Sequence, residues 1–273
     1  MSIPKVIHYC WYGYAAKPEY FERCYASWKK YAPEYEIVEW NESNTNIQAH
    51  PFMKKAYESK KWAFVSDIAR LQVVYDHGGI YLDTDVELRA PLDNLLEYSA
   101  FFFYDVNGNI NTGLGFAAEK GNALVKAVID DYRYHEFSLD VYKSLACPAL
   151  NTQAICSFFP AFECINKTKI INQHAFISSF EYARYALHLF CFSWKSDDDR
   201  KSDRYKKKKI RFFKIRRILR APCVFEFFRT QRLFRIDKIY RFFVYDLIDN
   251  GALYYVYRLV QKIKGKLIGS RCG

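Results

Sequence analysis

The sequence lacks any uncharged apolar run of about 18 residues, and we therefore expect no helix that crosses a membrane. Its eight cysteines form no C-x-x-C pair and no spacing typical of a zinc site. The first residues, Met-Ser-Ile-Pro-Lys, contain no basic region that leads into an apolar segment, so we predict no signal peptide. Together these absences indicate a cytoplasmic protein whose thiols are reduced and mostly buried.

Glycine and proline are scarce, with 11 and 8 positions among 273 residues, and charged residues make up 26%. This composition excludes a fibrous chain and a disordered one. Hydrophobic residues make up 51%, which is enough for one large core or at most two small ones. The chain is also rich in aromatic residues, with 23 Tyr and 23 Phe.

Charge is distributed unevenly along the chain. Up to residue 199 there are 19 Lys and Arg against 25 Asp and Glu, a net charge of −6, whereas residues 200–273 carry 22 against 5, a net charge of +17. The polar stretch 196–203 separates the two parts. We therefore predict a globular domain over residues 1–198 and a basic, aromatic, mostly helical tail over residues 199–273.

The positive charge of the tail must be balanced by an anionic partner or exposed to solvent. In Ile210–Arg220 the aromatic and aliphatic residues alternate with cations, a pattern that suits a helix lying on an anionic lipid surface. The same composition also occurs in proteins that bind phosphate backbones and stack bases, and it occurs in solvated helices. We expect an anionic membrane, contacted through residues 205–273, rather than nucleic acid. The expected location is the inner face of the cell membrane.

The first 195 residues alternate between predicted strands and helices, which favours an α/β sheet with helices on both faces. Strands are predicted at 5–12, 35–40, 80–82, 100–104, 113–118, 168–171 and 185–192. Helices are predicted at 18–31, 47–59, 62–77 and 122–133.

Two D-x-D pairs occur, and their contexts differ. Asp197 and Asp199 lie in the acidic stretch, where a solvated linker explains them. Asp83 and Asp85 follow a short apolar strand that comes after a helix-ending Gly78-Gly79 pair. In extended geometry, residues two apart point to the same side, so both carboxylates would converge at the carboxyl end of the strand. Mg²⁺ or Mn²⁺ suits such a pair, and a cap of the next turn is the structural alternative.

Ser66, Asp67 and Arg70 share one face of the helix before that strand. An ordinary ion pair on a helix surface would explain them. Their spacing from Asp83 and Asp85 instead favours a common site.

With these segments, the sequence resembles glycosyltransferase family 32. This is a family of D-x-D sugar transferases found in capsular polysaccharide clusters, and its core is similar to that of fungal mannosyltransferases. The resemblance covers residues 1–120 strongly and continues more weakly to about 195. It implies a GT-A type domain, with a mixed, mainly parallel sheet flanked by helices. The matching segments are Ile7–Gly13, Ser27-Trp28, Tyr35–Ile37, Trp40-Asn41, Ala63–Arg70 and Gly78–Glu87.

The resemblance assigns a role to each matching residue. Trp11 corresponds to the residue that stacks on the nucleotide base, although a lone tryptophan more often belongs to a core. Asp67 and Arg70 correspond to the pair that holds the donor sugar and diphosphate, beside Ser66. Asp83 corresponds to the aspartate that contacts ribose and sugar hydroxyls and reaches the metal partly through water. Asp85 corresponds to the direct metal ligand.

The end of the domain departs from the family pattern. His188 followed by Ser193-Trp194 resembles the family's closing His…Ser-Trp segment, but Leu189 and Phe192 replace its second histidine and its glycine. His188 is therefore either a metal ligand or a core histidine. Cys147-Pro148 stands where the family often has Gly-Pro, and the acceptor pocket beside it is predicted to include Asn151 and Thr152.

The resemblance implies a retaining glycosyltransferase that uses Mn²⁺ or Mg²⁺ and a nucleotide-sugar donor, with UDP favoured over GDP. The expected acceptor is a glycan or a lipid-linked glycan of surface polysaccharide synthesis. Two alternatives remain at this point: a catalytically inactive protein that binds nucleotide sugars, and a nucleic-acid-binding protein that acts through its basic tail. The intact set Asp67, Arg70, Asp83 and Asp85 argues against the first.

Overall fold

A computed structural model describes residues 2–140, 145–160 and 166–191 of the chain. The basic tail predicted for residues 199–273, and with it Ser193 and Trp194, lies outside these residues. Within the described ranges, no helix combines the length and the apolar character that crossing a membrane requires.

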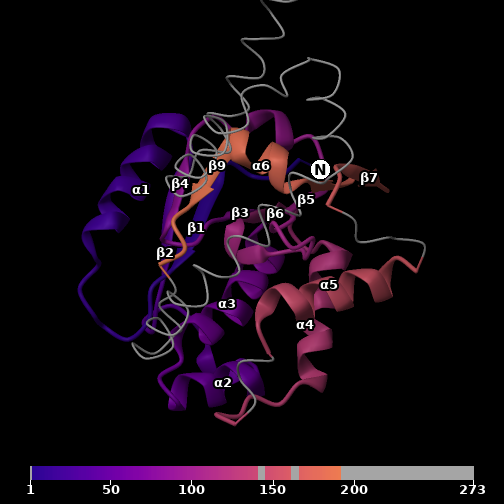
Figure 1. Ribbon diagram of the computed structural model, residues 1–273. Helices are drawn as coiled ribbons and strands as arrows, with labels where there is room; N and C mark the ends of the chain where they lie inside the picture. Colours follow the sequence, from indigo (N-terminus) through magenta and orange to yellow (C-terminus); the bar gives the residue numbers. More distant parts are fainter. Residues whose placement is uncertain (1, 141–144, 161–165, 192–273) are drawn as a thin grey trace, which may run out of the picture. The chain divides into compact units, whose positions relative to one another are not determined.

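Seven of the strands in the described ranges form one mixed sheet, in the order β2-β1-β3-β6-β5-β8-β7 (Figure 1). The pairs β2–β1, β1–β3 and β5–β8 are parallel, and β6 runs antiparallel to both β3 and β5. The strands of this sheet are β1 (Val6–Cys10), β2 (Glu36–Trp40), β3 (Gly79–Tyr81), β5 (Ala100–Phe103), β6 (Phe116–Ala118), β7 (Lys169–Ile171) and β8 (His174–Ile177). A separate antiparallel pair consists of β4 (Val86–Leu88) and β9 (Ala186–His188).

Helices cover both faces of the large sheet (Figure 1). The α-helices are α1 (Glu19–Tyr31), α2 (Pro51–Glu58), α3 (Trp62–His77), α4 (Ala123–Asp131), α5 (Cys147–Phe158) and α6 (Ser179–Tyr185). Short 3-10 turns are η1 (Ile47–Ala49), η2 (Asp93–Leu95), η3 (Thr112–Leu114) and η4 (Tyr132–Tyr134). The predicted α/β class, with a mixed sheet flanked by helices, is confirmed.

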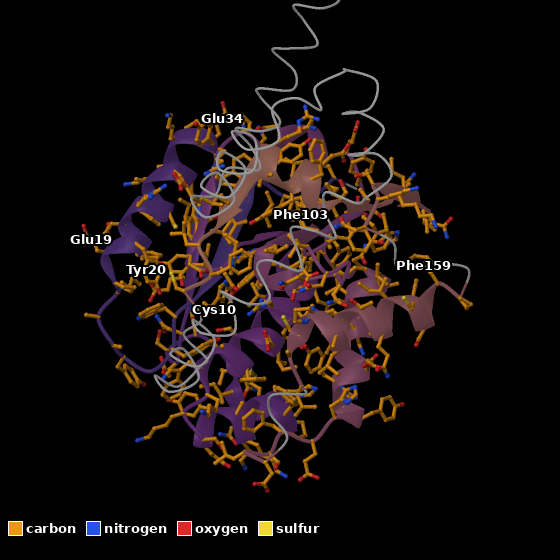
Figure 2. All side chains as sticks on the ribbon, in the orientation of Figure 1. Cys10, Glu19, Tyr20, Glu34, Phe103 and Phe159 are labelled. Atoms are coloured by element: carbon orange, nitrogen blue, oxygen red, sulfur yellow. The ribbon has the colours of Figure 1, made fainter. Side chains whose placement is uncertain are left out.

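Strand periodicity divides the buried side chains into two cores. In β5, Phe102 faces the core under α2, α3, α4 and α5, whereas Phe101 and Phe103 face the core under α1. The same alternation places Phe176 of β8 on the first face and Ile177 on the second. Figure 2 shows side chains filling the space between the ribbons on both sides.

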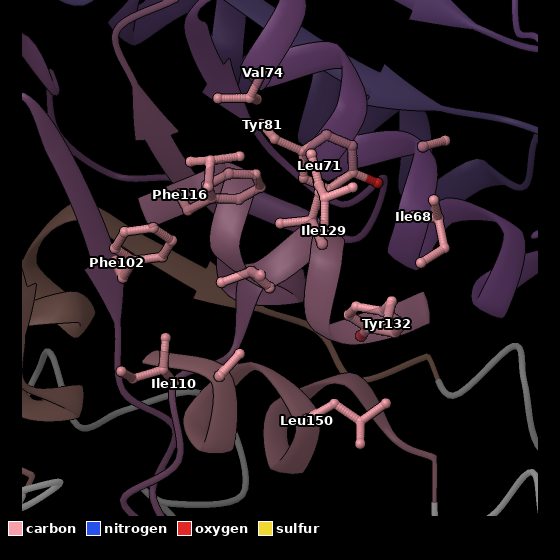
Figure 3. Packing of buried hydrophobic residues seen from close by; sticks show 14 of the residues in the cluster. Ile68, Leu71, Val74, Tyr81, Phe102, Ile110, Phe116, Ile129, Tyr132 and Leu150 are labelled. Carbon is pink, nitrogen blue, oxygen red and sulfur yellow. The ribbon is translucent and has the colours of Figure 1, made fainter. Parts of the chain in front are cut away.

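Helix α3 is fixed to the sheet by one apolar stripe. Ile68, Leu71 and Val74 recur at helical spacing and are all fully or almost fully buried. Figure 3 shows this stripe beside Tyr81 and Phe116 of the sheet. The helix is followed by Gly78, whose φ of 70° lies in the region that glycine adopts without strain. This packing fixes the rotation of α3, and therefore the direction in which its polar residues point.

Several predicted elements differ from the structure. The strand expected at 113–118 is a 3-10 turn followed by the short β6, and the helix expected at 47–59 is divided into η1 and α2. β4, β8, α5 and α6 were not predicted. β4 and β8 are only three and four residues long and carry little periodicity of their own. Helix α5 begins at Cys147-Pro148, where proline suits a first helical turn as well as a loop.

A buried histidine of β1 forms hydrogen bonds with β2 and with the residue between α3 and β3. The Trp40 indole N–H donates to Nδ1 of His8 at 3.1 Å, and Nε2 of His8 lies 2.8 Å from the Gly78 carbonyl oxygen. Since Nδ1 accepts, Nε2 carries the proton and donates it to Gly78. Burial of this neutral ring lowers the pKa of His8 from 6.5 to about 4.

We expect the free energy of unfolding to fall as the pH drops from about 6.5 to about 4. In that window the unfolded chain protonates His8 and the folded chain does not, so protons favour unfolding. The difference between the two pKa values is worth about 3 kcal/mol. The free energy of unfolding of wild type and of His8→Gln, measured against pH, should differ in slope only in this window. Parallel curves would contradict the prediction.

Candidate active site

The carboxyl ends of β1, β2 and β3 lie at one edge of the sheet because these strands are parallel neighbours. Trp11 directly follows β1, and Asp83 comes two residues after the end of β3. Ligand sites of open α/β sheets form at this edge. The expected position of the D-x-D pair is therefore correct.

The reason given for the convergence of Asp83 and Asp85 was wrong. Both were expected on an extended strand, but β3 ends at Tyr81 and the pair lies in a turn, which the Val86 N–H closes by donating to the Asp83 carbonyl at 3.0 Å. The carboxylates meet because this turn leads directly into β4.

His188 reaches the two aspartates through the pairing of β4 with β9. Val86 pairs with His188 across this antiparallel ladder. Nε2 of His188 lies 3.2 Å from Asp85 Oδ1 and 4.0 Å from Asp83 Oδ2. One oxygen from each aspartate and one nitrogen of His188 all lie within 4.8 Å of one another. Of the two readings of His188, the geometry favours the metal ligand over the core histidine.

The segment after β9 holds Asp85 from its other side. The backbone N–H of Leu189 donates to the Asp85 carbonyl oxygen, and that of Cys191 donates to Asp85 Oδ2, both at 2.9 Å. The backbone N–H of Phe190 donates to Nδ1 of His188 at 3.2 Å, which leaves Nε2 as the ring atom that faces the aspartates. Cys191 was not singled out from the sequence, because it contributes only its backbone.

Arg70 and Asp67 of α3 form a buried ion pair. Nη2 of Arg70 lies 2.9 Å from Asp67 Oδ1 and 3.4 Å from Asp83 Oδ1, and Nε donates to the Ser66 carbonyl oxygen at 3.0 Å. The side chains of Arg70 and Asp67 are 3% and 9% exposed. This burial excludes an ordinary ion pair on a helix surface and joins α3 to the D-x-D turn.

Tyr81 belongs to the same cluster and was not predicted from the sequence. Its hydroxyl donates to Asp83 Oδ1 at 2.8 Å, and the Arg70 guanidinium lies 4.9 Å from the centre of its ring. A tyrosine in a buried strand is typical of a core, and only its position two residues before Asp83 could have indicated this contact.

The pKa values of the ionisable groups in the cluster depart from their ordinary values in different directions. Burial raises the pKa of Asp67 to about 6 although Arg70 opposes the shift. Burial and the charge of Asp85 also raise the pKa of Asp83. Burial acts against the ionisation of Asp85 too, but His188 and the Cys191 N–H outweigh it and lower the pKa of Asp85. Burial likewise opposes the protonation of His188, but both aspartates outweigh it and raise the pKa of that ring.

One polar atom in the cluster is left without a hydrogen bond. Nη1 of Arg70 is buried and has no partner among the described residues. An unpaired guanidinium N–H in a buried position costs free energy, so this atom indicates a missing acceptor.

Two of the predicted ligand-binding residues lie beside the cluster and make contacts of their own. The half-buried Trp11 donates its indole N–H to the Ala15 carbonyl at 2.8 Å, which fixes the ring at the carboxyl end of β1. The hydroxyl of Ser66 donates to the Trp62 carbonyl at 3.1 Å, so Ser66 meets Arg70 through its backbone alone.

The residues expected at the acceptor pocket support the neighbouring loop. Nδ2 of Asn151 donates to Thr112 Oγ1 at 2.9 Å, and the Ile110 N–H donates to Thr152 Oγ1 at 2.8 Å. The Cys147 thiol donates to Asn111 Oδ1 at 3.8 Å. These contacts attach α5 to the segment between β5 and β6.

Comparisons with known proteins concern the same segment that forms this cluster. Residues 18–102 match the family described as "glycosyltransferase sugar-binding region containing DXD motif", a segment that includes Asp67, Arg70, Asp83 and Asp85. Over residues 18–102 the chain is similar to this sugar-binding region. The family resemblance stated from the sequence is confirmed.

Two curated relatives come from Schizosaccharomyces pombe. Inositol phosphoceramide mannosyltransferase 3 is 31% identical over 144 residues, which are 49% of this chain and 40% of that protein. Inositol phosphoceramide mannosyltransferase 2 is 32% identical over 100 residues, which are 35% and 29% of the two chains. The matches therefore span less than half the length of these relatives.

Solved structures of glycosyltransferases are also similar to this chain. The structure described as PaToxG glycosyltransferase has a TM-score of 0.46 at 20% identity and covers 58% of this chain and 71% of its own. A glycosyltransferase involved in the glycosylation of the major capsid of PBCV-1 has a TM-score of 0.40 at 12% identity, with 70% and 95% covered.

Proposed function

We propose that this protein is a metal-dependent glycosyltransferase that moves a sugar from a nucleotide diphosphate sugar to a glycan or lipid-linked glycan. The observation that carries the proposal is the convergence of Asp67, Arg70, Asp83, Asp85 and His188 at the carboxyl edge of the sheet. The motif segment of a D-x-D glycosyltransferase region supplies four of these five residues.

The donor set fits a divalent cation. Asp83, Asp85 and His188 offer two carboxylates and one imidazole within 4.8 Å, a combination that suits Mn²⁺ and, through the oxygens, Mg²⁺. Burial and the charge of Asp85 raise the pKa of Asp83 although Arg70 opposes the shift, and a cation bound there would favour the ionised carboxylate. A cation held there would stabilise the negative charge that develops on the departing diphosphate.

The remaining side chains bind and orient the donor. The unpaired Nη1 of Arg70 is suited to a phosphate or sugar oxygen, and Asp67 holds the guanidinium in place. Asp83 and Asp67 provide acceptors for sugar hydroxyls. Trp11 offers an aromatic face for the base, and fixing its indole N–H prepares that face for stacking.

We further propose a retaining outcome. Apart from the aspartates that already hold Arg70 or the cation site, the described cluster provides no carboxylate placed as a nucleophile. Attack of the acceptor from the side of the leaving group, with a diphosphate oxygen taking its proton, needs no such residue.

A surface polysaccharide or a lipid-linked glycan is the proposed acceptor. The relatives' names, inositol phosphoceramide mannosyltransferases, describe sugar transfer to a lipid and support the lipid-linked choice. The same names support a mannose donor, whereas the sequence favoured UDP as the carrier over GDP.

A panel of nucleotide sugars tests the proposal. We expect one UDP- or GDP-hexose to be hydrolysed slowly by the full-length protein when Mn²⁺ is present, with loss of activity on chelation. Binding of a donor without turnover would favour the catalytically inactive alternative. Failure of every donor to bind or react with Mn²⁺ or Mg²⁺ present would overturn the proposal.

We also propose that residues 205–273 attach the protein to an anionic membrane at the inner face of the cell membrane. The support is the net charge of +17 on residues 200–273 and the aromatic residues among its cations. Each Lys or Arg near an anionic surface contributes about 1 kcal/mol, so a third of the 22 would bind firmly at low salt.

Removal of residues 205–273 should release the protein from anionic vesicles and leave donor hydrolysis measurable, because the described candidate site residues all precede the tail. Flotation with vesicles that contain phosphatidylserine measures the first effect. The full-length protein should float less as salt rises, since screening weakens the charge attraction. A folded truncated protein that floats as well as the full chain would refute the membrane role, and binding to nucleic acid instead would favour that alternative.

A further inference from the structure

The turn Asn111–Gly113 lies directly against the ion pair of the candidate site. It connects β5 to β6, and its shape is held by Asn111, whose side-chain oxygen accepts from the Gly113 N–H at 2.9 Å. The Asn111 N–H donates to the Phe103 carbonyl at 3.0 Å, which joins the turn to the end of β5.

The turn is also anchored from behind by α5 and η4. Asn151, which is fully buried, donates to Thr112 Oγ1 at 2.9 Å and accepts from the Tyr132 hydroxyl at 3.4 Å. The Cys147 thiol donates to Asn111 Oδ1. These contacts oppose a movement of the turn that would make room for a larger side chain.

Gly113 is the point where this fixed turn meets the site. A Cβ atom on Gly113 would lie 2.8 Å from Asp83 Oδ2, 3.0 Å from Asn111 Oδ1 and 3.1 Å from Arg70 Nη1. All three distances are shorter than ordinary van der Waals contact with carbon. Gly113 does not have a positive φ, so an alanine backbone is permitted there and only space requires glycine.

We propose that Gly113 is a positioning residue of the donor site. Because it has no side chain, Arg70 and Asp83 can occupy the space beside it. This inference rests on the proposed function and adds a residue to it. A methyl group at Gly113 would displace the Asp83 carboxylate from His188 and from Arg70. It would also press on Nη1 of Arg70, which has no hydrogen-bond partner in the part of the chain that the structure describes.

Gly113→Ala in the full-length protein tests the inference. We expect the dissociation constants of Mn²⁺ alone, followed by electron paramagnetic resonance, and of UDP or GDP with Mn²⁺, followed by calorimetry, to rise at least tenfold. For the donor that the panel selects, kcat should fall as well, because a misplaced metal site impairs the transition state and not only binding.

Gly121→Ala is the matched control. Gly121 has a φ of 72° and no atom within 4 Å of an added Cβ, so alanine there strains the backbone without touching the site. Both variants should lower the melting temperature, but only Gly113→Ala should weaken Mn²⁺ and nucleotide binding. If Gly113→Ala binds Mn²⁺ and the nucleotide with dissociation constants within twofold of wild type, the inference is overturned and the proposed function is left intact.

A second variant tests the inference if Gly113→Ala does not fold. Asp83→Ala removes the oxygen nearest to the added methyl group, so it should restore a folded protein when combined with Gly113→Ala. A double variant as unfolded as Gly113→Ala alone would overturn the inference. A wild-type protein that binds neither Mn²⁺ nor UDP or GDP would overturn the proposed function, and the inference with it.

Discussion

Asp85→Asn is expected to abolish metal-dependent sugar transfer while the domain stays folded. The amide keeps the size of the carboxylate and keeps an oxygen that accepts from the Cys191 N–H. It loses the charge that a divalent cation requires, and the remaining carboxylate of Asp83 lies farther from His188, at 4.0 Å against 3.2 Å for Asp85. Activity with Mn²⁺ and Mn²⁺ binding should both be lost.

The structure indicates the direction in which Asp85→Asn changes the free energy of unfolding. Repulsion between Asp83 and Asp85 alone would predict a gain when one charge is removed. The pKa of Asp85 is nevertheless lowered, so the folded state stabilises the charged form, and Asp85→Asn should lose a little free energy of unfolding at neutral pH.

Asp199→Asn is the matched control, because it changes the second D-x-D pair of the sequence and should alter neither measurement. Turnover of Asp85→Asn near the wild-type rate, or wild-type turnover that survives strong chelation, would end the metal hypothesis.

The sequence was sufficient to predict the part of the site whose residues lie close together along the chain. Helix α3, the Gly78-Gly79 stop and the strand before Asp83 all carry clear periodic or glycine signals, and they place Asp67, Arg70 and Asp83 in one segment. The roles of these residues came from the resemblance. Burial of the Asp67–Arg70 pair could not be predicted, because the apolar stripe of α3 indicates only which face meets the sheet.

Contacts between distant segments account for what was missed. Cys191 and Asp85 are 106 residues apart, and the β4–β9 pairing joins their segments. A strand was predicted over residues 185–192, but nothing in the sequence indicated β4 as its partner. This pairing and the Phe190 N–H together place the side chain of His188. The turn at 111–113 was not predicted from the sequence, and its position beside Arg70 depends on α5, which was itself not predicted.

Arg70→Lys is expected to lower sugar transfer at least about tenfold, equivalent to about 1.4 kcal/mol of transition-state stabilisation. The guanidinium meets the Ser66 carbonyl, Asp67 and Asp83 at once and lies over the Tyr81 ring. A lysine ammonium keeps the charge but cannot hold a planar fork against these groups and also present a free N–H to the donor.

The loss should extend to stability, because Asp67 and Asp83 remain buried and are less well compensated when the guanidinium is gone. Arg23→Lys is the matched control: Arg23 pairs with Glu87 at 2.6 Å, but its side chain is 61% exposed, and exchange of an exposed cation should change neither activity nor stability appreciably. Steady-state kinetics with the selected donor and thermal unfolding of both variants measure the difference. Activity of Arg70→Lys within twofold of wild type would place Arg70 outside the reacting site and leave the buried ion pair with a structural role only.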